Sequence, residues 1–207
     1  NIFIDEFGFA YLAGFNNVNI SIPTAERGVA IIDLNDNPMQ PSLVHLYTEN
    51  YAHDVYVRNN LMFTSEIYKG EFAIIDVSDR TNPVALATQN TPSNFTHNTW
   101  LSDDGNTLFT TDERANASVS AYDISDFSDI EFLDSFRAEQ ETGLIPHNVH
   151  VKDNFLVVSH YTAGVLVLDA TETDALTLVE YYDTSFESGG GFKGCWGAYP
   201  FLPSGNI

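Results

Sequence analysis

The sequence has few positive charges: 8 Lys and Arg residues stand against 29 Asp and Glu in a chain of 207 residues, which gives a formal net charge of −21. A protein that binds nucleic acid or anionic lipid needs a basic surface, so both kinds of partner are excluded. No apolar run approaches the roughly 18 residues of a membrane-spanning helix, so no direct membrane insertion is expected. The acidic composition predicts an extracellular or cell-surface location.

Cysteine and recognisable catalytic motifs are also scarce. The single Cys195 cannot form an intramolecular disulfide, and the chain has no Cys-x-x-Cys motif for zinc or redox chemistry. It has neither the Gly-x-Ser-x-Gly motif of a nucleophilic serine nor a phosphate-binding P-loop. These absences favour a binding protein over an enzyme.

Helical periodicity is lacking as well. The apolar stretches are short, β-branched or aromatic, and they end at Asn, Asp, Gly or Pro, as in residues 72–76 and 165–169. Such runs are typical of β-strands, and the residues that end them are typical of tight turns. The sequence therefore predicts an all-β protein.

One of these predicted strands recurs along the chain. It reads Gly28-Val-Ala-Ile-Ile-Asp33, and its four copies end at Asp33, Asp76, Asp123 and Asp169, with spacings of 43, 47 and 46 residues. Four strands in about 45 residues is the size of a β-propeller blade. We therefore predict a β-propeller built from four-stranded blades.

The predicted repeats lie near 1–50, 51–94, 95–144 and 145–190, with the first part of a fifth blade at 191–207. Propellers close with about four to eight blades. Because both ends fall inside a predicted blade, we expect a single propeller portion of a larger ring; a ring closed by five blades is the alternative.

A second recurring element starts with histidine. It reads His53-Asp-Val-Tyr-Val, His97-Asn-Thr-Trp-Leu and His147-Asn-Val-His-Val, each in the first strand of a predicted blade. The first strand of a blade is the innermost one, so these side chains are expected to converge on the central channel. Neutral imidazole binds zinc, copper, iron and nickel, which makes the three histidines candidate transition-metal ligands. A histidine carried by a repeat can instead hydrogen-bond the backbone of the neighbouring blade, and the sequence favours that structural role.

Carboxylates near the ends of neighbouring strands could orient the histidines of such a site. These candidates are Asp54, Glu66, Asp112 and Glu113. Glu66, Glu113 and His160 occupy about the same place in their blades and could form a cation site at one rim, although a solvated rim is the commoner arrangement.

The repeated Asp-x-Ser-Asp segments offer another set of carboxylates. Hard oxygen ligands at alternate positions suit calcium. Asp side chains at strand ends also form Asx turns. The sequence favours the turn role over calcium for Asp76, Asp79, Asp123 and Asp126.

These blades resemble those of the bacterial choice-of-anchor B family, whose β-propellers overlap with the LVIVD-repeat proteins. The resemblance covers essentially the whole chain and rests on His97-Asn-Thr-Trp-Leu-Ser-Asp-Asp104 followed by Asp112-Glu113, on His147-Asn148, and on Trp196-Gly-Ala-Tyr-Pro-Phe-Leu-Pro-Ser-Gly-Asn206. It implies a secreted or surface protein with an interchangeable C-terminal anchor, with further blades before Asn1 and one or two strands after Ile207. The family has no settled activity. Trp196 of the last motif is a further candidate site residue.

Three hypotheses about function follow. The favoured one is a secreted or cell-surface binding or scaffolding module whose partner is a protein or a glycan. The second is a metal-dependent enzyme that uses His53, His97 and His147 with copper, zinc or iron. The third is a structural subunit that self-assembles into a surface filament or layer.

Overall fold

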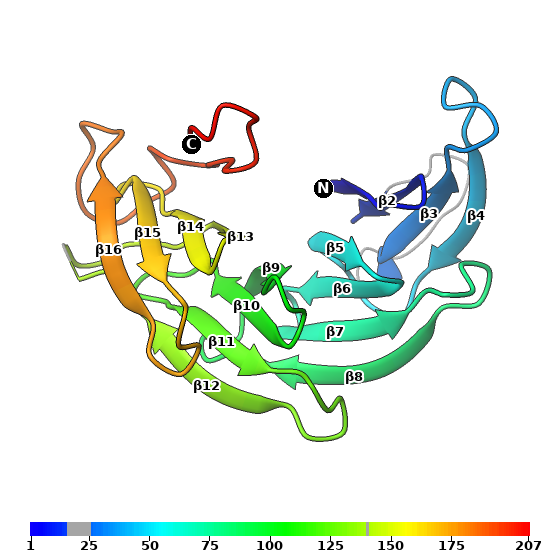
Figure 1. The fold of residues 1–207 in the computed structure, drawn as a ribbon, viewed down its shortest axis with the longest axis horizontal. Helices are drawn as coiled ribbons and strands as arrows, with labels where there is room; N and C mark the ends of the chain where they lie inside the picture. Colours follow the sequence, from blue (N-terminus) through cyan, green and yellow to red (C-terminus); the bar gives the residue numbers. More distant parts are fainter. Residues whose placement is uncertain (16–25, 140) are drawn as a thin grey trace. The chain divides into compact units, whose positions relative to one another are not determined.

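The computed structural model describes residues 1–15, 26–139 and 141–207, which form sixteen β-strands in four antiparallel sheets of four strands each (Figure 1). Within these residues there is no α-helix, and so none that is long and apolar enough to cross a bilayer. The predicted all-β class and the four-stranded blades are confirmed.

Each sheet is a meander in which neighbours in sequence pair with one another. The first contains β1 (Ile2–Ile4), β2 (Phe9–Ala13), β3 (Val29–Asp33) and β4 (Ser42–Tyr47). The second contains β5 (Asp54–Arg58), β6 (Leu61–Glu66), β7 (Glu71–Asp76) and β8 (Val84–Asn90). The third contains β9 (Thr96–Leu101), β10 (Thr107–Asp112), β11 (Val119–Asp123) and β12 (Glu131–Phe136). The fourth contains β13 (Asn148–Lys152), β14 (Phe155–Ser159), β15 (Val165–Asp169) and β16 (Thr177–Tyr182).

The four sheets fall inside the four predicted repeats, one sheet to a repeat. Residues 191–207, in which the sequence predicts the start of a fifth blade, contain no strand in the structure. Cys195 instead forms an isolated antiparallel bridge with Tyr161. Gly194, with a φ of 97°, and the prolines at 200 and 203 interrupt extended backbone in this segment. The fifth blade stays a prediction.

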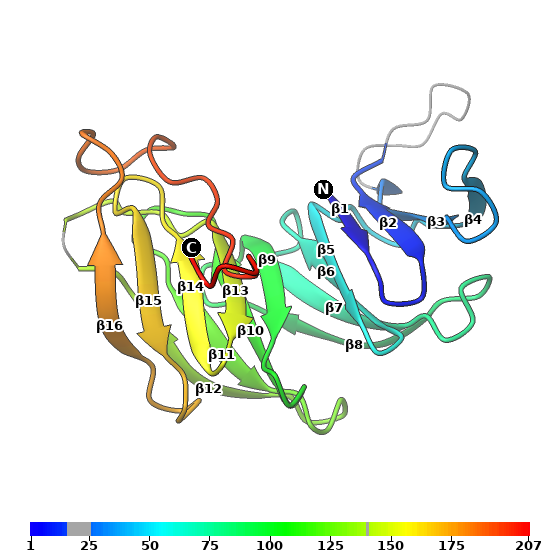
Figure 2. The same ribbon diagram turned by 45° about the horizontal axis from the view of Figure 1, so that its top comes forward.

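The chain forms two compact units, residues 1–90 and residues 91–207, with two blades in each. The first unit has its own apolar core, which includes Tyr11, Ile31, Met62 and Ile75. The core of the second unit comes mainly from β10, β11 and β13–β15, whose strands are visible in Figure 2, and includes Phe109, Val149, Leu156 and Leu166.

The recurring Asp at the end of each third strand caps the turn that follows. Its Oδ1 accepts a hydrogen bond from the backbone N–H two residues later in all four blades, at 2.7–2.8 Å. The bonds from Ser78 and Ser125 lower the pKa of Asp76 and Asp123. Asp79 and Asp126 cap the next turn in the same way, at 2.9 and 2.8 Å. The predicted Asx turns are therefore confirmed.

The same irregularity interrupts the pairing of the third and fourth strands in every blade. In the first blade Ile31 pairs with His45 and Ile32 with Leu43, so Val44 is an extra residue in the outer strand. The equivalent extra residues are Leu86, Leu133 and Val179. One extra residue in one strand of an antiparallel pair is a β-bulge, which bends the strand and increases its twist.

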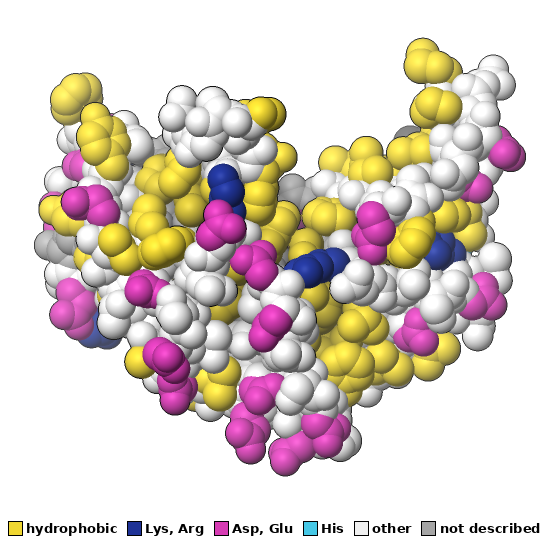
Figure 3. All heavy atoms as spheres, in the orientation of Figure 1, with side chains coloured by type: hydrophobic (Ala, Val, Ile, Leu, Met, Phe, Trp, Pro, Cys, Tyr) yellow, Lys and Arg dark blue, Asp and Glu magenta, His cyan; other side chains and the backbone are white. Residues whose placement is uncertain are grey.

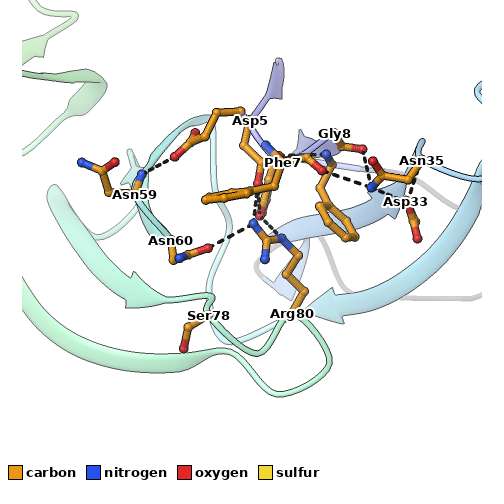
Figure 4. Close-up of polar contacts among 12 residues, drawn as sticks. Asp5, Phe7, Gly8, Asp33, Asn35, Asn59, Asn60, Ser78 and Arg80 are labelled. Atoms are coloured by element: carbon orange, nitrogen blue, oxygen red, sulfur yellow. Dashed lines mark hydrogen bonds and ion pairs between the residues drawn. The ribbon is translucent and has the colours of Figure 1, made fainter.

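In the first unit, Arg80 connects the β7–β8 turn to the blade before it (Figure 4). Its Nη2 donates to Asp5 Oδ2 at 2.8 Å and to Asn60 Oδ1 at 3.2 Å, and its Nε donates to the Tyr11 hydroxyl at 3.1 Å. The guanidinium carbon lies 4.3 Å from the ring centroid of Phe9. The carboxylate of Asp5 is fully buried, so this contact is an inter-blade ion pair shielded from water.

Candidate metal centre

Two of the three predicted ligands come together in the second unit. His97 lies in β9, His147 directly precedes β13, and both are buried. Glu113 directly follows β10, and one ligand atom from each of these three side chains lies within 4.8 Å of the others. Two imidazoles and one carboxylate at this separation could hold a single metal ion.

The carboxylate of Glu113 spans the two imidazoles. Its Oε2 lies 3.6 Å from His97 Nε2, and its Oε1 lies 3.7 Å from His147 Nε2. The ring centroids of the two histidines are 4.4 Å apart. The side chain of Glu113 retains 16% exposure, whereas those of the two histidines are each 3% exposed.

The hydrogen bond of His97 fixes which of its nitrogens faces Glu113. Its Nδ1 lies 3.1 Å from the backbone carbonyl oxygen of His147, which can only accept, so Nδ1 carries the proton. In the neutral ring, Nε2 then points a lone pair at a carboxylate 3.6 Å away. Two acceptors at this distance repel each other unless a cation, either a metal ion or a proton on Nε2, lies between them.

His97 therefore satisfies both interpretations of the recurring histidine. Through Nδ1 it bonds the backbone of the neighbouring blade, which is the structural role that the sequence favours. Through Nε2 it offers a ligand atom toward Glu113 and His147. The two roles use different ring nitrogens, so they are compatible.

Tyr161 completes the centre and was not found by sequence analysis. Its hydroxyl donates to Glu113 Oε1, and its ring lies 5.0 Å from that of His147. Burial raises the pKa of Tyr161, so the hydroxyl keeps the proton that it donates. Its φ is 39°, whereas every other non-glycine residue with a positive φ in the described chain is Asn or Asp. A large side chain held in this region costs about 1–3 kcal/mol and is typical of functional sites.

Trp196, singled out in the closing motif, also lies at this centre. Its ring is 5.1 Å from that of His147, and the Ser159 hydroxyl donates to its carbonyl oxygen at 3.2 Å. Phe192 lies four residues earlier and packs edge-on against the Tyr161 ring at 5.4 Å. The centre is therefore bordered by aromatic rings from the segment after β16.

The remaining candidates of the first unit have separate surroundings. His53 lies just before β5, with its ring 6.4 Å from that of Tyr51. Asp54 is buried, and its Oδ1 accepts from the N–H of Val55 at 2.8 Å. The role of His53 as a metal ligand and that of Asp54 as an orienting carboxylate stay predictions.

The expected rim of Glu66, Glu113 and His160 needs correction. Strand register makes Asp112, rather than Glu113, the equivalent of Glu66 and His160. The residue after each histidine pairs with Ser65, Thr111 or Ser159, and these three are followed by Glu66, Asp112 and His160. Glu66, Asp112 and His160 are only 1%, 2% and 2% exposed, so a solvated rim is wrong. Burial lowers the pKa of His160 to about 4, which keeps its imidazole neutral at pH 7.

Asp112 stabilises the backbone before β9 rather than orienting a histidine. Its oxygens accept hydrogen bonds from the Thr91 hydroxyl at 2.5 Å and from the N–H groups of Ser93 and Phe95, both at 2.8 Å. The carboxylate thus anchors the segment that enters β9. Glu113, one residue later, is the carboxylate that faces the histidines.

No family model and no curated protein matches this sequence. The periplasmic gluconolactonase of Pseudomonas aeruginosa aligns with 95% of the chain and 58% of its own length, at a TM-score of 0.68 and 14% identity. A protein from Lactobacillus plantarum aligns with 89% of the chain and 55% of its own length, at 0.69 and 14%. A chain of the nidogen–laminin complex aligns with 85% of the chain and 59% of its own length, at 0.56 and 10%.

The chain thus spans somewhat over half the length of these structures. At these identities the similarity shows the fold alone, because one fold supports unrelated functions. The matched structures include an enzyme and a member of a protein complex. The chain is therefore similar to β-propeller proteins in fold.

Proposed function

We propose that this chain is a β-propeller module of a secreted or cell-surface protein and that it binds a divalent transition-metal ion through His97, Glu113 and His147. One observation carries the proposal: one ligand atom from each of His97, Glu113 and His147 lies within 4.8 Å of the others, with the two Nε2 atoms at 3.6 and 3.7 Å from different oxygens of Glu113. A metal ion at this position could bind all three groups.

The donor set suits particular metals. Imidazole nitrogen together with carboxylate oxygen is a common set for zinc and iron, whereas calcium prefers oxygen alone. Three protein ligands also leave at least one coordination position for water or another ligand. The centre is therefore suited to binding a further molecule as well as the metal.

The proposed location has two supports of its own. The face drawn in Figure 3 carries many more acidic than basic side chains, as the net charge of −21 requires. One of the similar structures is a periplasmic protein. Membership of the choice-of-anchor B family and assembly into a filament stay predictions of the sequence.

The test is metal binding by the full chain and by variants that separate the two roles of His97. In His97→Asn the side-chain amide can still donate to the His147 carbonyl in place of Nδ1, but the Nε2 ligand is lost. We expect one zinc ion per wild-type chain by mass spectrometry and calorimetry, and no zinc in His97→Asn or Glu113→Gln. Glu139→Gln, at a carboxylate 80% exposed, is the control. Equal zinc binding by wild type and His97→Asn would overturn the proposal.

A metal-dependent hydrolase is the second candidate. Three protein ligands would leave a coordination position for water, and a metal-bound water would be a nucleophile at neutral pH. Gluconolactone is a reasonable first substrate, since one of the similar structures is a gluconolactonase. We would follow acid release by the zinc-loaded chain, with Glu113→Gln as the negative control. Release that zinc does not accelerate would leave a binding module.

A further inference from the structure

Two exposed aromatic side chains lie directly against the candidate metal centre. Trp196 and Phe192 are each 66% exposed, yet the ring of Trp196 contacts His147 and the ring of Phe192 contacts Tyr161. Apolar rings that remain in solvent beside a buried polar group are typical of ligand sites. We call these two side chains the aromatic rim.

The aromatic rim is fixed by its backbone. Tyr161 and Cys195 exchange two backbone hydrogen bonds, at 2.9 and 2.8 Å, and Cys195 itself is buried. The hydroxyl of Ser159 holds the carbonyl oxygen of Trp196. The indole is therefore held beside His147 before any ligand arrives, which lowers the entropic cost of binding.

Charge narrows the chemistry of the ligand. With a net charge of −21, the chain repels anions at long range, which favours the approach of a neutral ligand over an anionic one. A ligand that suits both the aromatic rim and a bound metal has a flat apolar face for the indole and an oxygen that can bind the metal. A sugar ring has these properties: its C–H face is apolar and its edge carries hydroxyl groups.

We infer that the aromatic rim binds a neutral sugar ring, with Trp196 against the C–H face and the hydroxyl edge toward the metal held by His97, Glu113 and His147. The metal part of this inference rests on the proposed function. The stacking part rests on Trp196 and Phe192 alone, so the two parts can fail separately.

Tryptophan fluorescence provides a direct test, because the chain has only two tryptophans. Trp100 is packed against His150 and Phe201, with ring centroids 4.7 and 5.5 Å away. Trp100→Phe therefore leaves Trp196 as the only reporter. We would titrate this zinc-loaded variant with glucose, galactose and mannose, with gluconate as an anionic probe and choline as a cationic one. A saturable change with at least one neutral sugar, and a weaker one with both charged probes, is expected.

Calorimetry on variants then locates the binding. Trp196→Leu should weaken sugar binding about tenfold, which corresponds to the loss of one stacked ring. Tyr182→Leu is the control, since Tyr182 is 74% exposed on the outer strand β16. No saturable response to any neutral sugar, or tighter binding of gluconate or choline, would overturn the inference.

The zinc-free protein separates this inference from the proposed function. Sugar binding that needs zinc and is lost in His97→Asn supports both. Sugar binding that is equal with and without zinc, and lost in Trp196→Leu, supports the aromatic rim but overturns the link to the metal. Zinc binding with no sugar response overturns the aromatic rim and leaves the proposed function standing.

Discussion

A single side chain, Tyr161, links backbone strain to the chemistry of the centre. Its positive φ costs free energy, and its hydroxyl holds one oxygen of Glu113 between the two imidazoles. A residue that orients a metal ligand typically changes metal affinity about 10- to 100-fold when it is replaced. Tyr161 is therefore a positioning residue: its backbone conformation is unfavourable, and its hydroxyl orients the carboxylate of Glu113.

Replacement of Tyr161 should separate these two properties. Tyr161→Phe keeps the ring and removes the hydroxyl, so we expect zinc affinity to fall about 10- to 100-fold with a small change in stability. Tyr161→Asn also removes the hydroxyl. Asn tolerates the left-handed backbone better than Tyr, so the relief of backbone strain should offset part of the stability lost with the ring. Calorimetry with zinc and urea denaturation measure the two effects.

The absorption spectrum of the cobalt-substituted protein is the readout that a purely structural role would not change. We expect the d–d bands of Tyr161→Phe to differ from those of wild type, because the carboxylate would no longer be held in one orientation. Identical spectra and identical zinc affinity would show that Tyr161 does not position Glu113.

Glu66, in the first unit, has a buried carboxyl group of which only one oxygen accepts a hydrogen bond from the residues that the structure describes. Thr64 donates to its Oε1 at 3.0 Å, while its Oε2 has no hydrogen-bond partner within the described chain. Burial is the main cause that raises its pKa from 4.5 to about 7, and nearby Glu71 adds to it while Lys69 opposes it. Tyr47, whose own pKa burial and Glu66 raise to about 12, lies near the same carboxyl.

This environment predicts a pH-dependent stability. Because the folded state holds the Glu66 proton more tightly than the unfolded state, the contribution of Glu66 to stability is greatest below pH 4.5 and falls until about pH 7, by about 3 kcal/mol. Glu66→Gln mimics the protonated form, so its stability relative to wild type should increase over that interval. Urea denaturation of both proteins at pH 4.5, 6 and 8 measures the difference. A constant difference across this range would contradict the prediction, and Glu139→Gln serves as control.

The sequence could predict part of the centre. The spacing of His97 and His147 was visible because both residues belong to the repeat, and Glu113 could be proposed because it follows a strand of the same blade. Tyr161 could not be found, since its hydroxyl meets a carboxylate 48 residues away and no local pattern indicates a positive φ at tyrosine. Its contact depends on how two blades pack.

At the scale of elements, a turn adds a polar contact to the apolar core that the two blades of the first unit share. The ion pair of Arg80 with Asp5 is the central contact. We expect Arg80→Met to lower the free energy of unfolding by about 3–5 kcal/mol, because it leaves the Asp5 carboxylate buried and uncompensated. Denaturation by urea measures the loss.

A double variant tests whether the buried charge is the cause. Asp5→Asn in the Arg80→Met background removes the uncompensated carboxylate and should recover at least half of the lost stability. If the double variant is as unstable as Arg80→Met, the loss comes from the packing of the Arg80 side chain against Phe9 instead.

The strands themselves were predictable, and their register was only partly so. Short alternating runs and the Asx-forming aspartates fixed the four sheets and the turns after β3, β7, β11 and β15. The equivalence of Glu113 with Glu66 was wrong by one residue, because the β9–β10 hairpin differs in length from its counterparts and a register shift lies between Thr111 and Asp112. Counting from the histidine cannot detect such a shift.

At the scale of the whole molecule, we expect a bound metal to stabilise only one of the two compact units. All three proposed ligands lie within residues 91–207. A ligand that binds only the folded state stabilises it by an amount that grows with the logarithm of the ratio of its concentration to its dissociation constant. We therefore expect zinc to slow hydrogen exchange in β9, β10, β13 and β14 and to leave β5–β8 unchanged. Mass spectrometry with and without zinc measures this, and equal protection of both units would contradict a centre confined to one of them.

The bulge that recurs in all four blades has a consequence for the behaviour of the protein at high concentration. An outer strand presents free N–H and C=O groups that a second chain can pair with, which is the usual beginning of cross-β aggregation. Val44, Leu86, Leu133 and Val179 each break the alternation of the strand that carries them. A straight incoming strand would therefore lose register after a few residues, so the same one-residue insertion that shapes each blade also limits fibre growth along its edge.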